Sequence, residues 1–147
     1  MPMTASITNR ILVGKTAGFV IGLIAFLAVP ALMPGVDPLL RWGMLLWYTT
    51  LGGLIGLFGL FSRHPVLLLP MPWWLRGSLL GAWMNFVLTF FAYDVLAEAM
   101  VILFGADGAL TSPFWFVAEG AVVGLIIAGI ATHIGGEGPA TARELPE

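Results

Sequence analysis

The sequence has no cysteine and few charges, and these two absences narrow the class of protein. Without cysteine, disulfides, thiol catalysis and cysteine-ligated zinc or iron–sulfur sites are excluded. Only 10% of the 147 residues are charged and 59% are hydrophobic, whereas a soluble domain has about 25% charged and about 45–50% apolar residues. Six basic residues spread along a chain of net charge −2 do not form the clustered surface that binds phosphates. We therefore expect an integral membrane protein that binds no nucleic acid.

Recognisable catalytic motifs are missing as well. The sequence contains no Ser–His–Asp order, phosphate-binding loop, zinc-ligand spacing or pair of carboxylates placed across a cleft. His64 and His133 lie at the ends of apolar segments, where we interpret them as residues of the membrane surface rather than as haem or metal ligands. We therefore expect a protein that is not an enzyme and that holds no cofactor or metal.

What the chain does contain is four long apolar segments. A transmembrane helix needs about 20 consecutive apolar residues, and segments of about this length or longer cover residues 11–33, 42–61, 77–104 and 113–133. The third segment stays largely apolar past Asp94, so we expect one helix that protrudes beyond the hydrocarbon. These segments predict an all-α membrane protein, a compact bundle of four transmembrane helices that forms a single domain over residues 1–133.

The remaining parts of the chain differ in composition. Residues 62–74 are apolar but broken by prolines, and we expect them to lie along the membrane interface. Residues 134–147 mix glycine, proline and charges, which predicts a disordered cytoplasmic tail, and residues 1–9 form a short polar leader. The first apolar segment, flanked by Arg10 and Lys15, is also typical of a secretory signal. We favour a membrane anchor, because its apolar stretch exceeds the roughly 7–15 residues of a signal core.

Small residues recur at steps of four in all four apolar segments. In lipid, helices come into close contact where small residues let backbones approach and where polar side chains bond across the interface. The residues that we predict to form these helix-packing faces are Gly14, Gly18, Gly22, Gly52, Gly56, Gly77, Gly81, Asn85, Gly120 and Gly124. The two halves of the chain align with Trp47 on Trp115 and Tyr48 on Phe116, which is compatible with two parallel helix-hairpin repeats. Convergent packing of unrelated helices is the interpretation we favour.

Glu119 is the only charged residue in the fourth apolar segment. It lies six residues after Pro113, or about 9 Å along a helix, where a charge is costly unless it is paired or hydrated. We expect hydroxyl-bearing residues to form a polar layer around it, with one more acid at the outer boundary. An acid inside a membrane is a candidate proton or cation site, and a neutral glutamic acid that ties helices together is the alternative. The candidate ligand- or ion-binding residues are Glu119, Thr49, Thr50, Thr89, Tyr93 and Asp94.

The basic residues predict an orientation. If both termini lie in the cytoplasm, Arg41 is the only one of the six basic residues outside, which is the bias that sets membrane topology. We expect a multi-pass protein of a bacterial inner membrane with cytoplasmic termini.

Two functions remain. The first is an accessory or assembly subunit that presents Trp83 and the apolar residues 66–69 to a larger membrane complex. The second is a small oligomeric transporter or channel with Glu119 as a proton or cation site. We favour the first, because a four-helix bundle packed through glycines leaves little room for a pathway. The expected partners are the lipid bilayer and either other membrane subunits or further copies of the chain.

Overall fold

A computed structural model describes residues 6–142 of the chain. Residues 6–9 of the polar leader belong to this part, whereas residues 1–5 and the end of the tail, with Arg143, lie outside the described residues. Within the described part the fold is all-α, as predicted. The helices are α1 (Ile7–Leu32), α2 (Pro38–Phe58), α3 (Trp73–Phe91), α4 (Tyr93–Phe104), α5 (Trp115–Gly135) and the short 3-10 helix η1 (Pro139–Ala142).

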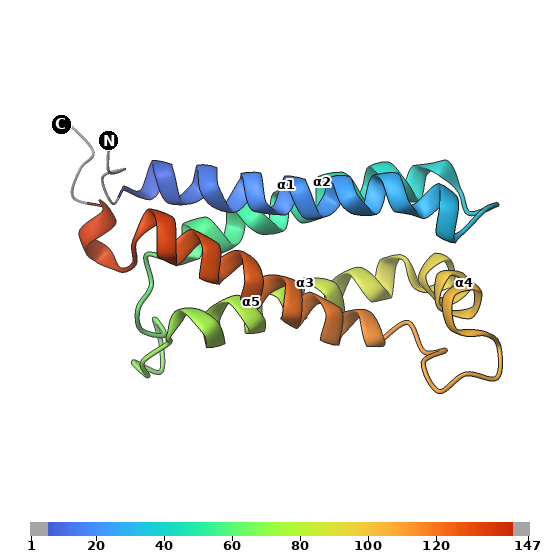
Figure 1. Ribbon diagram of the computed structural model, residues 1–147. Coiled ribbons are helices and arrows are strands. Elements are labelled where there is room, and N and C mark those ends of the chain that lie inside the picture. The colour runs from blue at the N-terminus through green and yellow to red at the C-terminus, as the bar shows by residue number, and fades with distance from the viewer. Residues whose placement is uncertain (1–5, 143–147) are drawn as a thin grey trace.

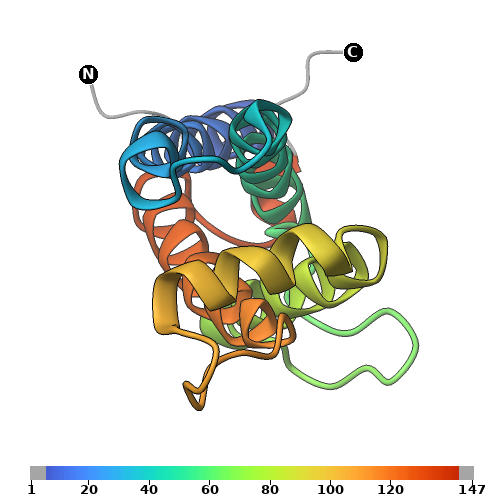
Figure 2. The same cartoon turned by 90° about the vertical axis from the view of Figure 1, so that its right-hand side faces the viewer.

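The long helices form two antiparallel pairs that lie against each other (Figure 1). The helices α1 and α2 make one layer, and α3 and α5 make the other. The start of α1, the end of α2, the start of α3 and the end of α5 lie together at one end of the bundle, which we call the terminal end (Figure 1). At the opposite end, α4 lies across the bundle (Figure 2).

The prediction of one continuous helix over residues 77–104 is wrong. The chain bends by 104° between α3 and α4, at Ala92, whose φ of −117° and ψ of 24° are not helical. Instead of protruding, α4 turns over the end of the bundle and buries Leu96, Ala99 and Met100. Neither proline nor glycine marks the break, so the bend follows from the apolar face of α4 packing on the bundle rather than from a local signal.

Two helices, α1 and α5, are long and apolar enough to cross a membrane, and the bent pair of α3 and α4 makes a third if it counts as one span. This agrees with the prediction of a membrane protein. With 21 residues, α2 is as long as α5, but Arg41, Tyr48 and two threonines make it less apolar.

Glycines bring the helices of each pair into backbone contact. A Cβ atom added at Gly18 of α1 would meet the carbonyl of Tyr48 in α2, and one added at Gly14 would meet the carbonyl of Gly52. In the other pair, a Cβ atom at Gly81 would meet the Gly120 carbonyl in the same way. No side chain fits at these positions unless the helices move apart. Similar contacts involve the other glycines of the predicted faces, Gly22, Gly56, Gly77 and Gly124.

Two arginines occupy the terminal end. Arg10 of α1 is fully buried, and its guanidinium donates to the carbonyl of Gly56 in α2 (3.0 Å), to the hydroxyl of Thr132 in α5 (3.0 Å) and to the Gly136 carbonyl. The last carbonyls of a helix have no partner within the helix and carry its negative dipole end, so a buried cation stabilises both α2 and α5. Arg10 thereby connects the two layers.

The beginning of the tail is ordered at the same end, which differs from the expected disorder after residue 133. Arg76 forms an ion pair with Glu137 (2.7 Å), and the Gly138 amide donates to the Gly59 carbonyl (3.1 Å). Thr141 in η1 is buried. Composition predicted disorder because the tail lacks apolar anchors, but these polar contacts fix it as far as residue 142.

The glycine contacts lead to a first prediction. Gly81→Leu or Gly124→Leu is expected to lower the free energy of unfolding in detergent by about 1–3 kcal/mol or more, because the side chain must force two backbones apart. Gly43→Ala in α2 is the control, since nothing lies within 4 Å of its added Cβ atom. Thermal melts monitored by circular dichroism make the comparison. If both leucine variants melt like the parent protein, the bundle does not depend on these contacts.

Candidate functional site

Three helices contribute to a buried polar cluster at Glu119. One carboxyl oxygen of Glu119, in α5, accepts a hydrogen bond from the Tyr48 hydroxyl of α2 (2.7 Å). The other accepts from Nδ2 of Asn85 in α3 (2.8 Å). The indole nitrogen of Trp47 in α2 donates to Oδ1 of Asn85 (2.9 Å). We refer to Trp47, Tyr48, Asn85 and Glu119 as the Glu119 cluster.

The directions of these hydrogen bonds follow from the groups involved. An indole N–H can only donate and a backbone carbonyl can only accept. Oδ1 of Asn85 therefore faces Trp47, and Nδ2 faces the Phe116 carbonyl (2.8 Å) and Glu119. The amide orientation is fixed, so Glu119 always receives a donor from Asn85.

Tyr48 is the adaptable member of the cluster. Its hydroxyl can donate to an ionised Glu119 or accept a hydrogen bond from a protonated one, whereas Asn85 can only donate to it. The cluster therefore accommodates both forms of the carboxyl without movement of a helix. Among the described residues, no lysine or arginine forms an ion pair with Glu119.

The predicted polar layer of hydroxyls around Glu119 is not formed. Thr49 and Thr50 donate to carbonyls one turn earlier in α2, at 2.7 and 2.8 Å, and Thr89 donates to the Asn85 carbonyl at 2.8 Å. Threonines in helices commonly bond the carbonyl at i−4, which leaves no donor for a neighbouring helix. The bend after α3 turns the remaining two candidates away. Tyr93 contacts the ring of Phe114, and Asp94 is exposed.

Sequence reasoning placed Glu119 and Asn85 inside the bundle but missed their partners on α2. A signal for one of them exists, because Tyr48, Gly52 and Gly56 follow each other at steps of four and share one helix face. A tyrosine on the same helix face as packing glycines points to the neighbouring helices, so its hydroxyl lies at the interface between them. The sequence analysis used Gly52 and Gly56 as packing residues and Tyr48 only in the alignment of the two halves.

Two mainly apolar cavities lie beside the cluster. One cavity of about 240 Å³ is lined by Trp47, Tyr48 and Asn85 together with Leu96 of α4. Another of about 310 Å³ is lined by Glu119 together with Met100 and other α4 side chains. Both cavities are almost free of polar surface, and α4 contributes a wall to each.

A second boundary separates the cluster from the arginines of the terminal end. It consists of buried residues of α2 and α5 that pack in one hydrophobic core with Tyr48: Leu51, Ile55, Val123, Ile127 and Ala128. Leu51 and Ile127 have no exposed surface at all. The Glu119 cluster is therefore a partly buried polar site beside an apolar core.

The chain matches no protein-family model, no curated protein and no solved structure.

The cluster leads to a second prediction, which concerns stability. Glu119→Gln should fold almost like the parent, because its amide oxygen accepts from Asn85 and its nitrogen donates to the Tyr48 oxygen. Glu119→Leu leaves the donors of Tyr48 and Asn85 without this acceptor and should lower the free energy of unfolding by about 1–3 kcal/mol. Thr50→Val is the control, since the Thr50 hydroxyl bonds only within its own helix. Equal melting temperatures for the leucine and glutamine variants would contradict a helix-tying role.

Proposed function

We propose that the chain crosses the membrane four times and acts as a non-enzymatic accessory or assembly subunit of a larger membrane complex. The four passes are α1, α2, the bent pair of α3 and α4, and α5. Support for α2 as a pass comes from its contact with α1 along most of its length, from Gly56 against Ile11 to Leu45 against Gly22. A helix that runs beside a spanning helix over this distance lies at the same membrane depth.

The charges of the described residues support cytoplasmic termini. Arg10, Lys15, Arg63 and Arg76 lie at or near the terminal end, where Glu137 is the only described acid. The acids Asp37, Asp94, Glu98 and Asp107 lie at or near the opposite end, together with Arg41. Positive charge favours the cytoplasmic side, so the terminal end is the cytoplasmic one in this proposal.

Topology provides the third prediction. A reporter enzyme fused after Glu147 should give a cytoplasmic signal, and one inserted at Gly108, in the connection before α5, should give an external signal. A reporter in the connection between α2 and α3 should read cytoplasmic if α2 is a pass. An external signal from that third position would remove α2 from the count of passes, and a cytoplasmic signal at Gly108 would reverse the orientation.

The observation that carries the subunit proposal is an exposed apolar loop that is held by local hydrogen bonds. Residues 66–69, with the sequence VLLL, are between 59% and 79% exposed, and the loop stands off from the helices (Figure 2). The amides of Val66 and Leu67 donate to Nδ1 of His64 (3.2 and 3.0 Å), and Leu68 has a φ of 55°, which is uncommon for a residue with a side chain. A loop that is already ordered loses little entropy on binding, so it suits docking against a partner.

The apolar core beside Glu119 supports the same proposal over a transport pathway. Between the Glu119 cluster and the arginines, the buried side chains of the interior belong to the apolar core that contains Leu51 and Ile127. Within each pair the backbones touch at glycines, so no passage runs between paired helices either. Trp83, 60% exposed on the outer face of α3, extends the apolar surface that the loop begins.

The fourth prediction tests the loop as a docking surface. A photo-cross-linking amino acid at Leu67 should couple the chain to a foreign membrane subunit in native membranes. The same probe at Leu39, which is 73% exposed at the opposite end, should not give that adduct. Leu67→Glu should abolish co-purification of the subunit without changing the melting temperature of the isolated chain. Recovery of only a homo-oligomer or a monomer from lipid particles would contradict the proposal.

Glu119 supports a second candidate function, a proton or cation site in a small oligomeric transporter. The observation in its favour is that the cluster accepts both forms of the carboxyl and borders a cavity beneath α4. Glu119→Gln separates the two functions, because it removes ionisation and keeps the hydrogen bonds. Transport requires that the growth phenotype or ion flux be lost while folding and oligomer size are kept. A folded and fully active glutamine variant excludes this candidate and leaves the accessory role.

A further inference from the structure

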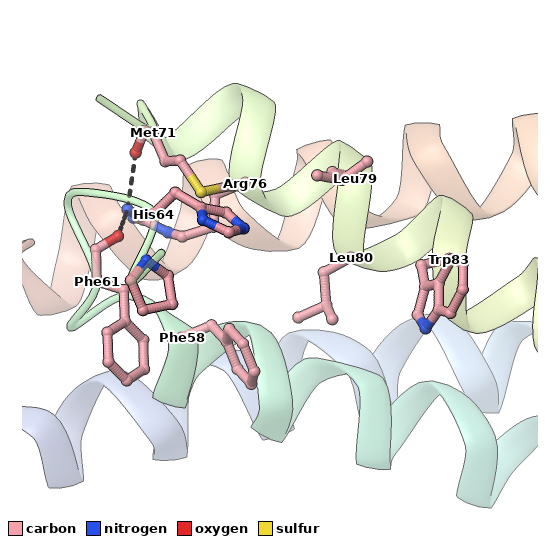
Figure 3. A pocket seen from close by; sticks show the side chains of 9 residues that line it. Phe58, Phe61, His64, Met71, Arg76, Leu79, Leu80 and Trp83 are labelled. Atoms are coloured by element: carbon pink, nitrogen blue, oxygen red, sulfur yellow. Dashed lines mark hydrogen bonds between the residues drawn. The ribbon is translucent and has the colours of Figure 1, made fainter. Parts of the chain in front are cut away.

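An apolar groove lies on the outer face of the bundle between the end of α2 and α3 (Figure 3). It has a volume of about 490 Å³, within the range of about 300–1,000 Å³ that is typical of small-molecule sites. Phe58 and Phe61 form one side, and Leu79, Leu80 and Trp83 of α3 form the other. Leu79 and Trp83 are more than half exposed, so the groove opens towards the surroundings of the bundle rather than into its interior.

Among the described residues that line this groove, the only ionisable side chains are at its terminal end. Both are donors: the imidazole of His64 and the guanidinium of Arg76 (Figure 3). Nδ1 of His64 accepts two backbone amides, so the neutral ring carries its proton on Nε2 and can only donate from that atom. The guanidinium of Arg76 donates to the carbonyls of Phe61 and Met71 and to Glu137.

The charge around this end of the groove is positive. Arg63, next to His64 in the chain, is exposed, and Arg10 lies at the same end of the bundle. Glu137 is the only described acid there. Because α1 and α5, the two clear candidate spans, begin and end at this level, it corresponds to the headgroup region of a bilayer. Basic residues at that level attract anionic lipids.

We propose that this groove binds one anionic phospholipid, with an acyl chain along Phe58, Leu80 and Trp83 and the phosphate at His64 and Arg76. Charge complementarity and the shape of the site carry this inference. The groove combines a long apolar lining with ionisable donors at one end only, which matches an amphiphile with an acidic head. The inference goes beyond the subunit proposal and does not depend on it, because the lipid binds to the isolated chain. It places a lipid between the two surfaces, residues 66–69 and Trp83, that are proposed to meet a partner.

Native mass spectrometry of the purified full chain tests the proposal. The chain is mixed in detergent with phosphatidylglycerol or with phosphatidylcholine of the same acyl chains. We expect one phosphatidylglycerol to be retained, with a preference over phosphatidylcholine of about fivefold or more for each basic residue that faces the headgroup. Leu79→Trp fills the groove from its exposed side and should abolish retention. Ile24→Trp is the matched control, because Ile24 is similarly exposed on α1 and does not line the groove.

A second variant tests the headgroup separately from the groove. Arg63→Gln removes one exposed charge and leaves the apolar lining intact, so it should reduce the preference for phosphatidylglycerol without reducing the melting temperature. Equal retention of the two lipids by the parent chain would overturn the proposal. Unchanged lipid retention by Leu79→Trp would overturn it as well, and so would a bound polypeptide in place of lipid. None of these outcomes bears on cross-linking at Leu67, so this proposal and the subunit proposal fail independently.

Discussion

Backbone contact between paired helices is the constraint on which the rest of this structure depends. In lipid, apolar surface gives no driving force for association, so helices are held by close packing and by hydrogen bonds between them. The carbonyls of Gly14, Tyr48 and Gly52 set the approach of α1 to α2, and those of Gly77 and Gly120 set the approach of α3 to α5. Each pair packs as one layer because its two backbones touch. The contacts between the two layers, rather than those within a layer, therefore determine whether the bundle can open.

Two groups of polar contacts join the two layers, and an apolar core lies between these two groups. At the terminal end, Arg10 reaches from α1 to the carbonyl ends of α2 and α5. On the side of the core that faces α4, the Glu119 cluster connects α2 to α3 and α5. A guanidinium that donates to carbonyls at helix ends and a carboxyl that accepts from side-chain donors are complementary solutions to the same requirement, because each buried polar group needs a partner.

The sequence predicted the features that one helix determines by itself. Apolar length predicted the helices, the spacing of glycines indicated which faces are small, and position along the fourth segment placed Glu119 at depth. Features that need two helices were missed, because spacing within one segment does not specify the rotation of its neighbour. Tyr48 rather than Thr49 or Thr50 therefore meets Glu119. The bend at Ala92 has no local breaker, and the ordered tail depends on arginines far away in the chain. The alignment of the two halves as parallel repeats stays a prediction. In the structure Gly18 contacts Tyr48 and Gly81 contacts Gly120, so the contacts make Tyr48 equivalent to Gly120, whereas the alignment places it on Phe116.

The two candidate functions differ in whether α4 has to move. It has no side-chain cap bond at its start, and it is held by the burial of Leu96, Ala99 and Met100 against the bundle. The cavities beside Trp47 and Glu119 are lined almost entirely by apolar side chains, and α4 contributes to both. Transport would require α4 to expose these three buried residues in each cycle, whereas a subunit that docks through its loop requires no movement. The hydrogen bonds of Glu119 to Tyr48 of α2 and Asn85 of α3 connect the two layers, so a movement that broke them would also weaken the contact between the layers.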